Sequence, residues 1–221
     1  MTAVIVIAKA PVAGRSKTRL TPPCSPNEAA ALAEAALADT LEAVAACGAS
    51  RRVLALDGEP GAWLPPGFEV VPQRGGGLAQ RLAAAFDDCA ERAFLVGMDT
   101  PQLTPALLDA AREHPCAFGA APDGGWWGLG LPAPDARVFA DIPMSADDTG
   151  ARQLERLREL GYDPALLPEL RDVDTIADAH IVAAQAPEGR FATVLRGLAS
   201  LPESLNSADA VAEHPIAPRI A

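Results

Sequence analysis

The sequence lacks the features that would place this chain in a membrane. No apolar run approaches the roughly 20 residues that a helix needs to cross a bilayer. No basic leader or signal-peptide pattern precedes the first apolar run, which begins at residue 3. We therefore expect a cytoplasmic protein without a membrane span.

Cysteine and histidine motifs are also missing. Four cysteines (Cys24, Cys47, Cys89 and Cys116) are scattered, with no CxxC pair and no zinc spacing among them and the three histidines. No HExxH motif and no Ser-His-Asp order occurs, which disfavours metalloprotease and hydrolase activities. We expect reduced, unpaired thiols and no structural zinc.

Basic residues are scarce relative to acidic ones. The chain has 18 Lys and Arg against 29 Asp and Glu, for a formal net charge of −11. Such a balance disfavours general binding to nucleic acids or anionic membranes, because both attract basic surfaces. An anionic ligand would have to be held by a local cluster of cations, so the positions of the Lys and Arg residues are informative.

The hydrophobic pattern predicts one α/β domain. Short apolar runs, of which Ala3–Ala8 is the first, alternate with longer helical segments. Strands are predicted at 3–8, 52–56, 68–71, 93–97, 116–121, 126–131 and 165–167, and helices at 26–47, 78–91, 105–114, 147–160 and from 175 onward. This alternation is typical of a mostly parallel sheet covered on both faces. We expect a single domain over residues 1–201 and a loosely held tail over 202–221.

A basic loop follows the first predicted strand. Lys9–Leu20 (KAPVAGRSKTRL) holds four of the 18 basic residues, namely Lys9, Arg15, Lys17 and Arg19. Cations beside a glycine suit a polyphosphate, although the loop is neither a Walker motif nor a dinucleotide fingerprint. The alternative is a solvated surface loop that is basic by chance.

A carboxylate follows the fourth predicted strand. Asp99 lies just beyond the apolar run 93–97, and ligands of open parallel sheets bind beyond the carboxyl ends of the strands. A carboxylate there is a hard oxygen ligand suited to Mg²⁺. The alternative is an Asx turn, helped by Pro101.

Three further stretches leave two interpretations open. Asp172–Thr175 is either a helix cap or a second carboxylate source for the metal of Asp99. Gln73–Leu78 is either a mobile connector or a loop close to a nucleobase. Asp123–Trp127 is a hairpin signal, and one of its two tryptophans is available to stack on a substrate.

Four motifs together, AKAPVAGRSKTRL, GMDTPQLTPALL, PDGGWWGLGL and DVDT, resemble those of a bacterial family. The chain resembles the nucleotide-diphospho-sugar transferase-like proteins of GT-A type from about residue 3 to residue 180. Characterised relatives include 2-phospho-L-lactate guanylyltransferase and molybdenum cofactor guanylyltransferase. The chain differs from the family pattern at Trp126 and Trp127, where tyrosine is more common, and in the Ile-Ala-Asp after Thr175, where Pro-Glu-Asp is usual.

The resemblance implies a GT-A/Rossmann-like three-layer α/β/α sandwich and a role for individual residues. Nucleotide phosphates would face the basic loop, through Lys9, Gly14, Arg15, Lys17 and Arg19. Asp99 and Asp174 would hold one Mg²⁺ or Mn²⁺. The base would lie near Gly75, Gly76, Gly77 and Leu78, and the acceptor near Asp123, Gly124, Gly125 and Trp126.

These implications predict a metal-dependent nucleotidyltransferase or nucleotide-sugar glycosyltransferase that acts on a small-molecule acceptor. Lys17, Arg19 and Asp99 would be its catalytic residues, and catalysis would rest on positioning and electrostatic stabilisation rather than on a nucleophilic side chain. The alternative is a regulatory protein that binds the nucleotide without turnover.

Overall fold

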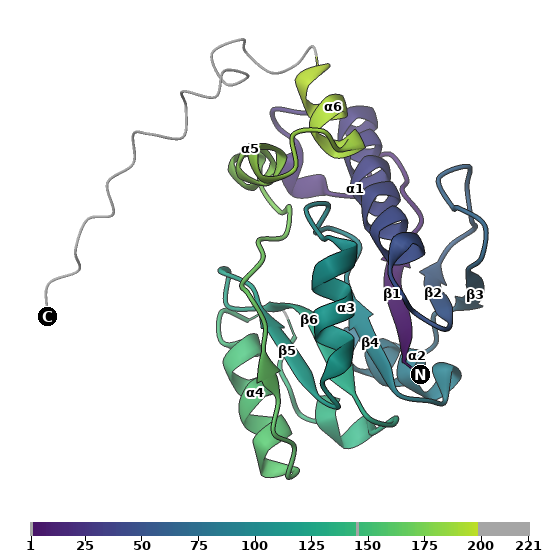
Figure 1. The fold of residues 1–221 in the computed structure, drawn as a ribbon. Coiled ribbons are helices and arrows are strands. Elements are labelled where there is room, and N and C mark those ends of the chain that lie inside the picture. Colours follow the sequence, from purple (N-terminus) through teal and green to yellow (C-terminus); the bar gives the residue numbers. More distant parts are fainter. Residues whose placement is uncertain (1, 145, 199–221) are drawn as a thin grey trace, which may run out of the picture.

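A computed structural model describes residues 2–144 and 146–198 as a seven-stranded sheet between helices (Figure 1). The strand order is β3-β2-β1-β4-β6-β5-β7, and only β6 runs antiparallel to its neighbours. The strands are β1 (Ala3–Lys9), β2 (Arg52–Asp57), β3 (Glu69–Pro72), β4 (Ala93–Val96), β5 (Ala117–Ala120), β6 (Trp126–Leu131) and β7 (Ala165–Leu166). The predicted α/β class with a mostly parallel sheet is confirmed.

Helices cover both faces of the sheet, and the last two helices of the described residues pack outside the helices on one of these faces (Figure 1). They are α1 (Pro26–Ala46), α2 (Leu78–Cys89), α3 (Pro105–Glu113), α4 (Thr149–Glu159), α5 (Ile176–Gln185) and α6 (Arg190–Arg196), with short 3-10 turns η1 (Thr18–Leu20) and η2 (Ala136–Phe139). No helix in the described ranges has both the length and the apolar character of a membrane span.

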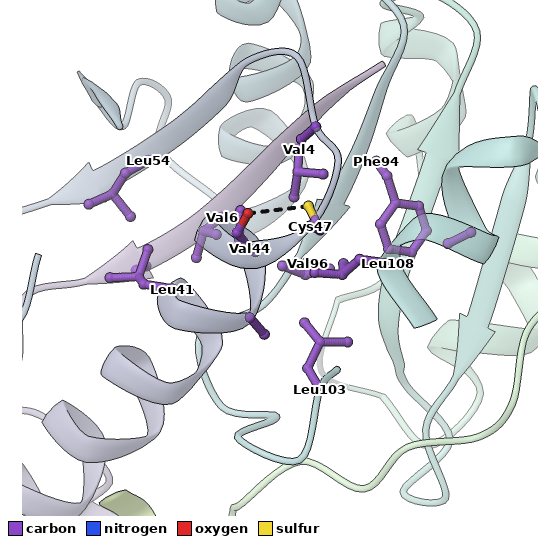
Figure 2. Close-up of a cluster of buried hydrophobic side chains, with 14 of the residues drawn as sticks. Val4, Val6, Leu41, Val44, Cys47, Leu54, Phe94, Val96, Leu103 and Leu108 are labelled. Carbon is purple, nitrogen blue, oxygen red and sulfur yellow. Dashed lines mark hydrogen bonds between the residues drawn. The ribbon is translucent and has the colours of Figure 1, made fainter. Parts of the chain in front are cut away.

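Alternation along the central strands builds a core on each face. Val4 and Val6 of β1 pack toward α1 and α3, in the cluster drawn in Figure 2. Ala3 and Ile5, one residue out of phase, pack toward α2, η2 and α4. Because side chains alternate across a strand, an uninterrupted apolar run is buried on both faces, as the sequence predicts.

Local signals fix where the helices begin. Ser25 and Glu28 form the capping box that the sequence Ser-Pro-Asn-Glu predicts before α1, and Thr175 and Asp178 form another before α5. The helix predicted over 78–91 ends earlier, at Cys89, because Ala90 adopts a left-handed conformation with φ 57°. All four cysteines are buried.

The helix α6 is absent from the sequence-based prediction. Its first N–H groups are satisfied from a distant element, since the Asp39 carboxylate on α1 accepts hydrogen bonds from Arg190 N (3.0 Å) and Phe191 N (2.9 Å). α5 and α6 pack on the outer side of α1 through a third apolar cluster, which includes Val182 and Phe191. The predicted domain boundary at residue 201 and the tail 202–221 lie outside the described residues.

Asp135, at the start of η2, is expected to stabilise the fold in a pH-dependent way. Its carboxylate accepts hydrogen bonds from Arg137 Nε (2.8 Å), Arg137 Nη2 (2.7 Å) and Tyr162 Oη (2.9 Å). The bonds from Arg137 lower the pKa of Asp135 to about 2, against the opposing effect of burial. A carboxyl group whose pKa is lower in the folded than in the unfolded state stabilises the fold at pH values above its unfolded-state pKa. This stabilisation is lost as the pH falls toward the folded-state pKa of about 2.

We therefore expect Asp135→Asn to lower the free energy of unfolding by about 1 kcal/mol at pH 7, a modest value because Arg137 is exposed and solvent screens the pair. Urea unfolding at pH 7 and pH 3 would measure this difference, which should shrink at the lower pH. The matched control is Asp148→Asn, which removes an exposed i,i+4 ion pair with Arg152 and should change stability by less than about 0.5 kcal/mol. An equal loss at both pH values would contradict this account.

Candidate nucleotide and metal site

The two loops singled out in the sequence leave neighbouring strands at the same edge of the sheet. β1 and β4 pair in parallel, with Val6 opposite Val96, so their carboxyl ends lie side by side. The Lys9 N–H lies 3.3 Å from Met98 Sδ, just before Asp99. The basic loop and Asp99 are therefore adjacent, as expected for a ligand site of a parallel sheet.

A compact turn in the basic loop directs Lys17 back toward this edge. The Val12 carbonyl accepts hydrogen bonds from the N–H groups of Arg15 and Ser16, and Ser16 Oγ accepts one from Val12 N at 2.9 Å. Gly14 has φ 75° and open space around it. Lys17 itself is left-handed, with φ 46°, which is uncommon for a residue other than glycine.

Lys17 lies between two carboxylates. Its Nζ is 2.8 Å from Asp99 Oδ2 and 3.2 Å from Asp174 Oδ1, and only 12% of the side chain is exposed. Arg19 Nη1 contacts the other oxygen of Asp174 at 2.7 Å, with 72% of its side chain in solvent. Burial disfavours the charged amine, but the charges and hydrogen bonds of Asp99 and Asp174 outweigh it and raise the pKa of Lys17. The ammonium is therefore charged at neutral pH.

An extended segment brings Asp172 and Asp174 to Asp99. Val173 N–H donates to the Asp99 carbonyl at 3.0 Å, and Gln102 Nε2 donates to the Arg171 carbonyl at 2.7 Å. Val173 is buried, so the two aspartates on either side of it are held at the surface of the site. Thr175 and Asp178 make the cap of α5. The helix-cap interpretation therefore applies to Thr175 and Asp178 rather than to Asp172 and Asp174.

Three carboxylates form a cluster that fits a divalent cation. One oxygen from each of Asp99, Asp172 and Asp174 lies within 4.8 Å of the others. Burial, together with the charges of Asp99, Asp123 and Asp174, raises the pKa of Asp172 to about 7, and Lys17 opposes the shift. A divalent cation would supply the missing countercharge, and carboxylate oxygens are the ligands that Mg²⁺ and Mn²⁺ prefer.

Asp172 lies in the stretch 172–175 that the sequence offers as a second carboxylate source, but only Asp174 is named there as a metal ligand, so the part of Asp172 in the cluster is new. The signal that could have found it is the pattern Asp-Val-Asp, in which two polar residues flank an apolar one, as in an extended segment with one buried side chain.

Asp123, in the hairpin turn between β5 and β6, lies close enough for its charge to raise the pKa of Asp172. Asp123 Oδ1 accepts a hydrogen bond from Gly125 N at 2.8 Å. The Gly124 carbonyl accepts one from Gly150 N at 2.7 Å, which ties the turn to α4. Trp126 is half-buried and lies 6.5 Å from the ring of Phe118, whereas Trp127 is buried on the opposite face.

The glycine-rich loop starts near the end of β1. Gln73 Nε2 donates to the Ala8 carbonyl at 2.7 Å, and Gly76 N–H donates to Gln80 Oε1 at 2.8 Å. Gly75 has φ 105°, Gly77 caps α2 and Leu78 is exposed. Within residues 2–144 and 146–198, no hydrogen bond or ion pair joins 75–78 to the three carboxylates, and Lys9 and Arg15 are exposed to solvent.

Comparison with known proteins places the chain in a family. Residues 31–146 match the family described as uncharacterized proteins conserved in bacteria (DUF2064). The chain belongs to the DUF2064 family. The matched range of this DUF2064 protein contains Asp99 and Asp123, while the basic loop and Asp172–Asp174 lie outside it. No curated protein matches the chain.

Solved structures share the fold. A candidate nucleotide-diphospho-sugar transferase from Desulfovibrio desulfuricans G20 is 25% identical, with 89% of this chain and 95% of that chain covered and a TM-score of 0.78. CMP:2-keto-3-deoxy-manno-octonic acid synthetase, solved with CTP, is 13% identical over 85% of this chain and 100% of its own, with a TM-score of 0.52. 2-C-methyl-D-erythritol 4-phosphate cytidylyltransferase from Thermus thermophilus is 18% identical over 85% and 100%, with a TM-score of 0.50. The predicted resemblance to GT-A-like transferases is confirmed.

Proposed function

We propose that this protein is a transferase that uses a nucleotide donor, either a nucleoside triphosphate whose nucleotidyl group is transferred or a nucleotide sugar. The observation that carries the proposal is the convergence of Lys17 and Arg19 with Asp99, Asp172 and Asp174 at the carboxyl ends of β1 and β4. Cations beside a carboxylate cluster are what a phosphate–metal complex requires. The likeness to the D. desulfuricans protein supports the same class of reaction.

Asp99 and Asp174 would hold Mg²⁺ or Mn²⁺, with Asp172 as an additional oxygen ligand. When bound, the metal would neutralise charge on the phosphate oxygens of the donor. The chain's own cations would act on the same phosphates: Lys17 and Arg19 bind the leaving phosphates and stabilise the negative charge that develops on them. Lys9, Gly14 and Arg15 complete this phosphate-binding loop.

The remaining predicted residues would position the two substrates. Gly75–Leu78 would lie against the base, and Asp123–Trp126 would border the acceptor. In nucleotidyl transfer, an acceptor oxygen forms a bond to the α-phosphorus as the bond to the bridging oxygen breaks, and pyrophosphate leaves with that electron pair. In glycosyl transfer, an acceptor hydroxyl oxygen forms a bond to the sugar carbon as the bond from that carbon to the diphosphate oxygen breaks. The nucleoside diphosphate leaves with that electron pair, and the hydroxyl proton passes to the departing phosphate or to solvent. Positioning and electrostatic stabilisation suffice for either step.

Product analysis tests the proposal. The protein would be incubated with each nucleoside triphosphate or nucleotide sugar, Mg²⁺ and a panel of phosphorylated and hydroxylated acceptors. We expect release of pyrophosphate or of a nucleoside diphosphate that stops when EDTA removes the metal. Nucleotide binding without release of either product across the panel would instead support a regulatory protein, and absence of nucleotide binding would contradict the proposal.

A further inference from the structure

We propose that Lys17 is a latch on the metal site: its ammonium group and the divalent cation compete for the carboxylates of Asp99 and Asp174, and nucleotide phosphates release the site by drawing Lys17 away. This inference rests on the proposed function, because it concerns how metal and donor bind to the same site. It predicts that metal binds weakly by itself and more tightly together with the donor.

The geometry of the carboxylates makes the two cations mutually exclusive. Asp99 and Asp174, whose oxygens lie 2.8 and 3.2 Å from Lys17 Nζ, are two of the three carboxylates whose ligand atoms lie within 4.8 Å of one another. An ion held by that cluster would share two carboxylates with a largely buried ammonium group and would lie close to it. Like charges at such separation, shielded from water, repel strongly. Metal binding therefore requires Lys17 to move.

The surroundings of Lys17 give it another partner and a path. Arg19 contacts the far oxygen of Asp174 and projects into solvent, where it can meet a phosphate first. Gly14, with open space around it, lies three residues before Lys17 in the same loop. A phosphate that binds both side chains replaces the carboxylates as their partners, so neither cation is left unpaired when Asp99 and Asp174 become available.

The residue type at position 17 fits this exchange. Lys9 and Lys17 are the only two lysines of the chain, and every other basic residue besides the histidines is arginine. An arginine fork would grip two carboxylates through several fixed donors, whereas an ammonium on a flexible stem makes interchangeable contacts. A lysine between Asp99 and Asp174 is therefore suited to release them.

Mn²⁺ binding to the full chain without nucleotide tests the latch. We expect Lys17→Met to bind Mn²⁺ at least about 10-fold more tightly than wild type, measured by the electron paramagnetic resonance signal of free Mn²⁺, because the competing charge is removed. Lys9→Met, which removes an equal charge from the same loop without touching the carboxylates, should change the affinity less than about 3-fold. Lys17→Arg, which keeps the charge, should bind Mn²⁺ no more tightly than wild type.

A second measurement follows the wild-type protein, so it does not depend on the folding of Lys17→Met. With lysine labelled at Cε with ¹³C, the chain gives two lysine signals, and Lys9→Met assigns them. Saturating Mg²⁺ should shift the Lys17 signal as the ammonium leaves Asp99 and Asp174, and should shift the Lys9 signal less.

The outcomes separate the latch from the proposed function. If Lys17→Met and Lys9→Met tighten Mn²⁺ binding equally, or if Mg²⁺ binds without moving the Lys17 signal, the latch is wrong while the metal site stands. If neither wild type nor Lys17→Met binds Mn²⁺ at millimolar concentrations, the metal site itself is wrong and both proposals fall.

Discussion

Asp99→Asn is expected to abolish metal-dependent nucleotide binding, with a loss of at least about 100-fold in the affinity measured with Mg²⁺. Changes even to residues behind a metal ligand cost 10- to 100-fold, and Asp99 would be a ligand itself. Asparagine keeps the shape of the side chain but removes the charge that faces both Lys17 and the metal. Isothermal titration with the nucleotide that binds best, with and without Mg²⁺, measures the effect.

The fold should tolerate this change. Asp99 is partly exposed, its backbone carbonyl still accepts the hydrogen bond from Val173, and Lys17 keeps Asp174 as a partner. We expect the melting temperature to stay within a few degrees of wild type. The matched control is Asp88→Asn, because Asp88 also pairs with one cation, Arg74, and its side chain is 26% exposed against 28% for Asp99. Metal-dependent affinity equal in the two variants would show that Asp99 does not hold the metal.

Gly124→Ala is expected to be the most damaging of the substitutions considered for stability, lowering the free energy of unfolding by more than about 3 kcal/mol. A Cβ at Gly124 would lie 1.8 Å from the Asp147 carbonyl oxygen, which is backbone and cannot move alone. Relief would require breaking the hydrogen bond from Gly150 N to the Gly124 carbonyl and separating the turn from α4. Urea unfolding measures the loss, and Asp123 would be displaced with the turn.

Gly161→Ala isolates the packing contribution to this effect. Gly161 has φ 86°, nearly the 88° of Gly124, but nothing lies within 4 Å of the position that its Cβ would take. Its substitution therefore carries only the cost of a left-handed alanine, about 1 kcal/mol. If both variants lost the same free energy of unfolding, the close approach of Gly124 to Asp147 would contribute nothing to the effect of the substitution.

Much of the fold was predictable because its signals are local. The run Ala3–Ala8 is apolar on both faces, Ser25 and Glu28 cap α1, and Asp123 begins the turn of a hairpin, as the sequence predicts. Each of these features depends on residues within a few positions of one another. The insertion of β6 between β4 and β5 is not local, since it depends on how completed strands pair.

The candidate site was predictable only in part, for the same reason. Asp99 could be placed because a strand end fixes it, and the basic loop because its charge runs against that of the chain. The pattern Asp-Val-Asp indicates an extended segment around Asp172, but its role also depends on the path of residues 165–174, held by long-range bonds such as that from Val173 to Asp99, which this pattern does not specify. α6 was missed because Asp39, which caps it, lies 151 residues away from Arg190.

The contact between Lys17 and Asp174 joins residues separated by 157 positions. Closing so long a loop costs entropy that only the assembled sheet and its helices can offset, and contacts of this kind form late in folding. The phosphate-binding and acidic halves of the site therefore come together after the strands that carry them. Nascent chains and partly folded forms that lack the last quarter of the sequence would carry Lys17, Arg19 and Asp99 without Asp172 and Asp174, so the complete carboxylate cluster is itself a marker of a completed fold.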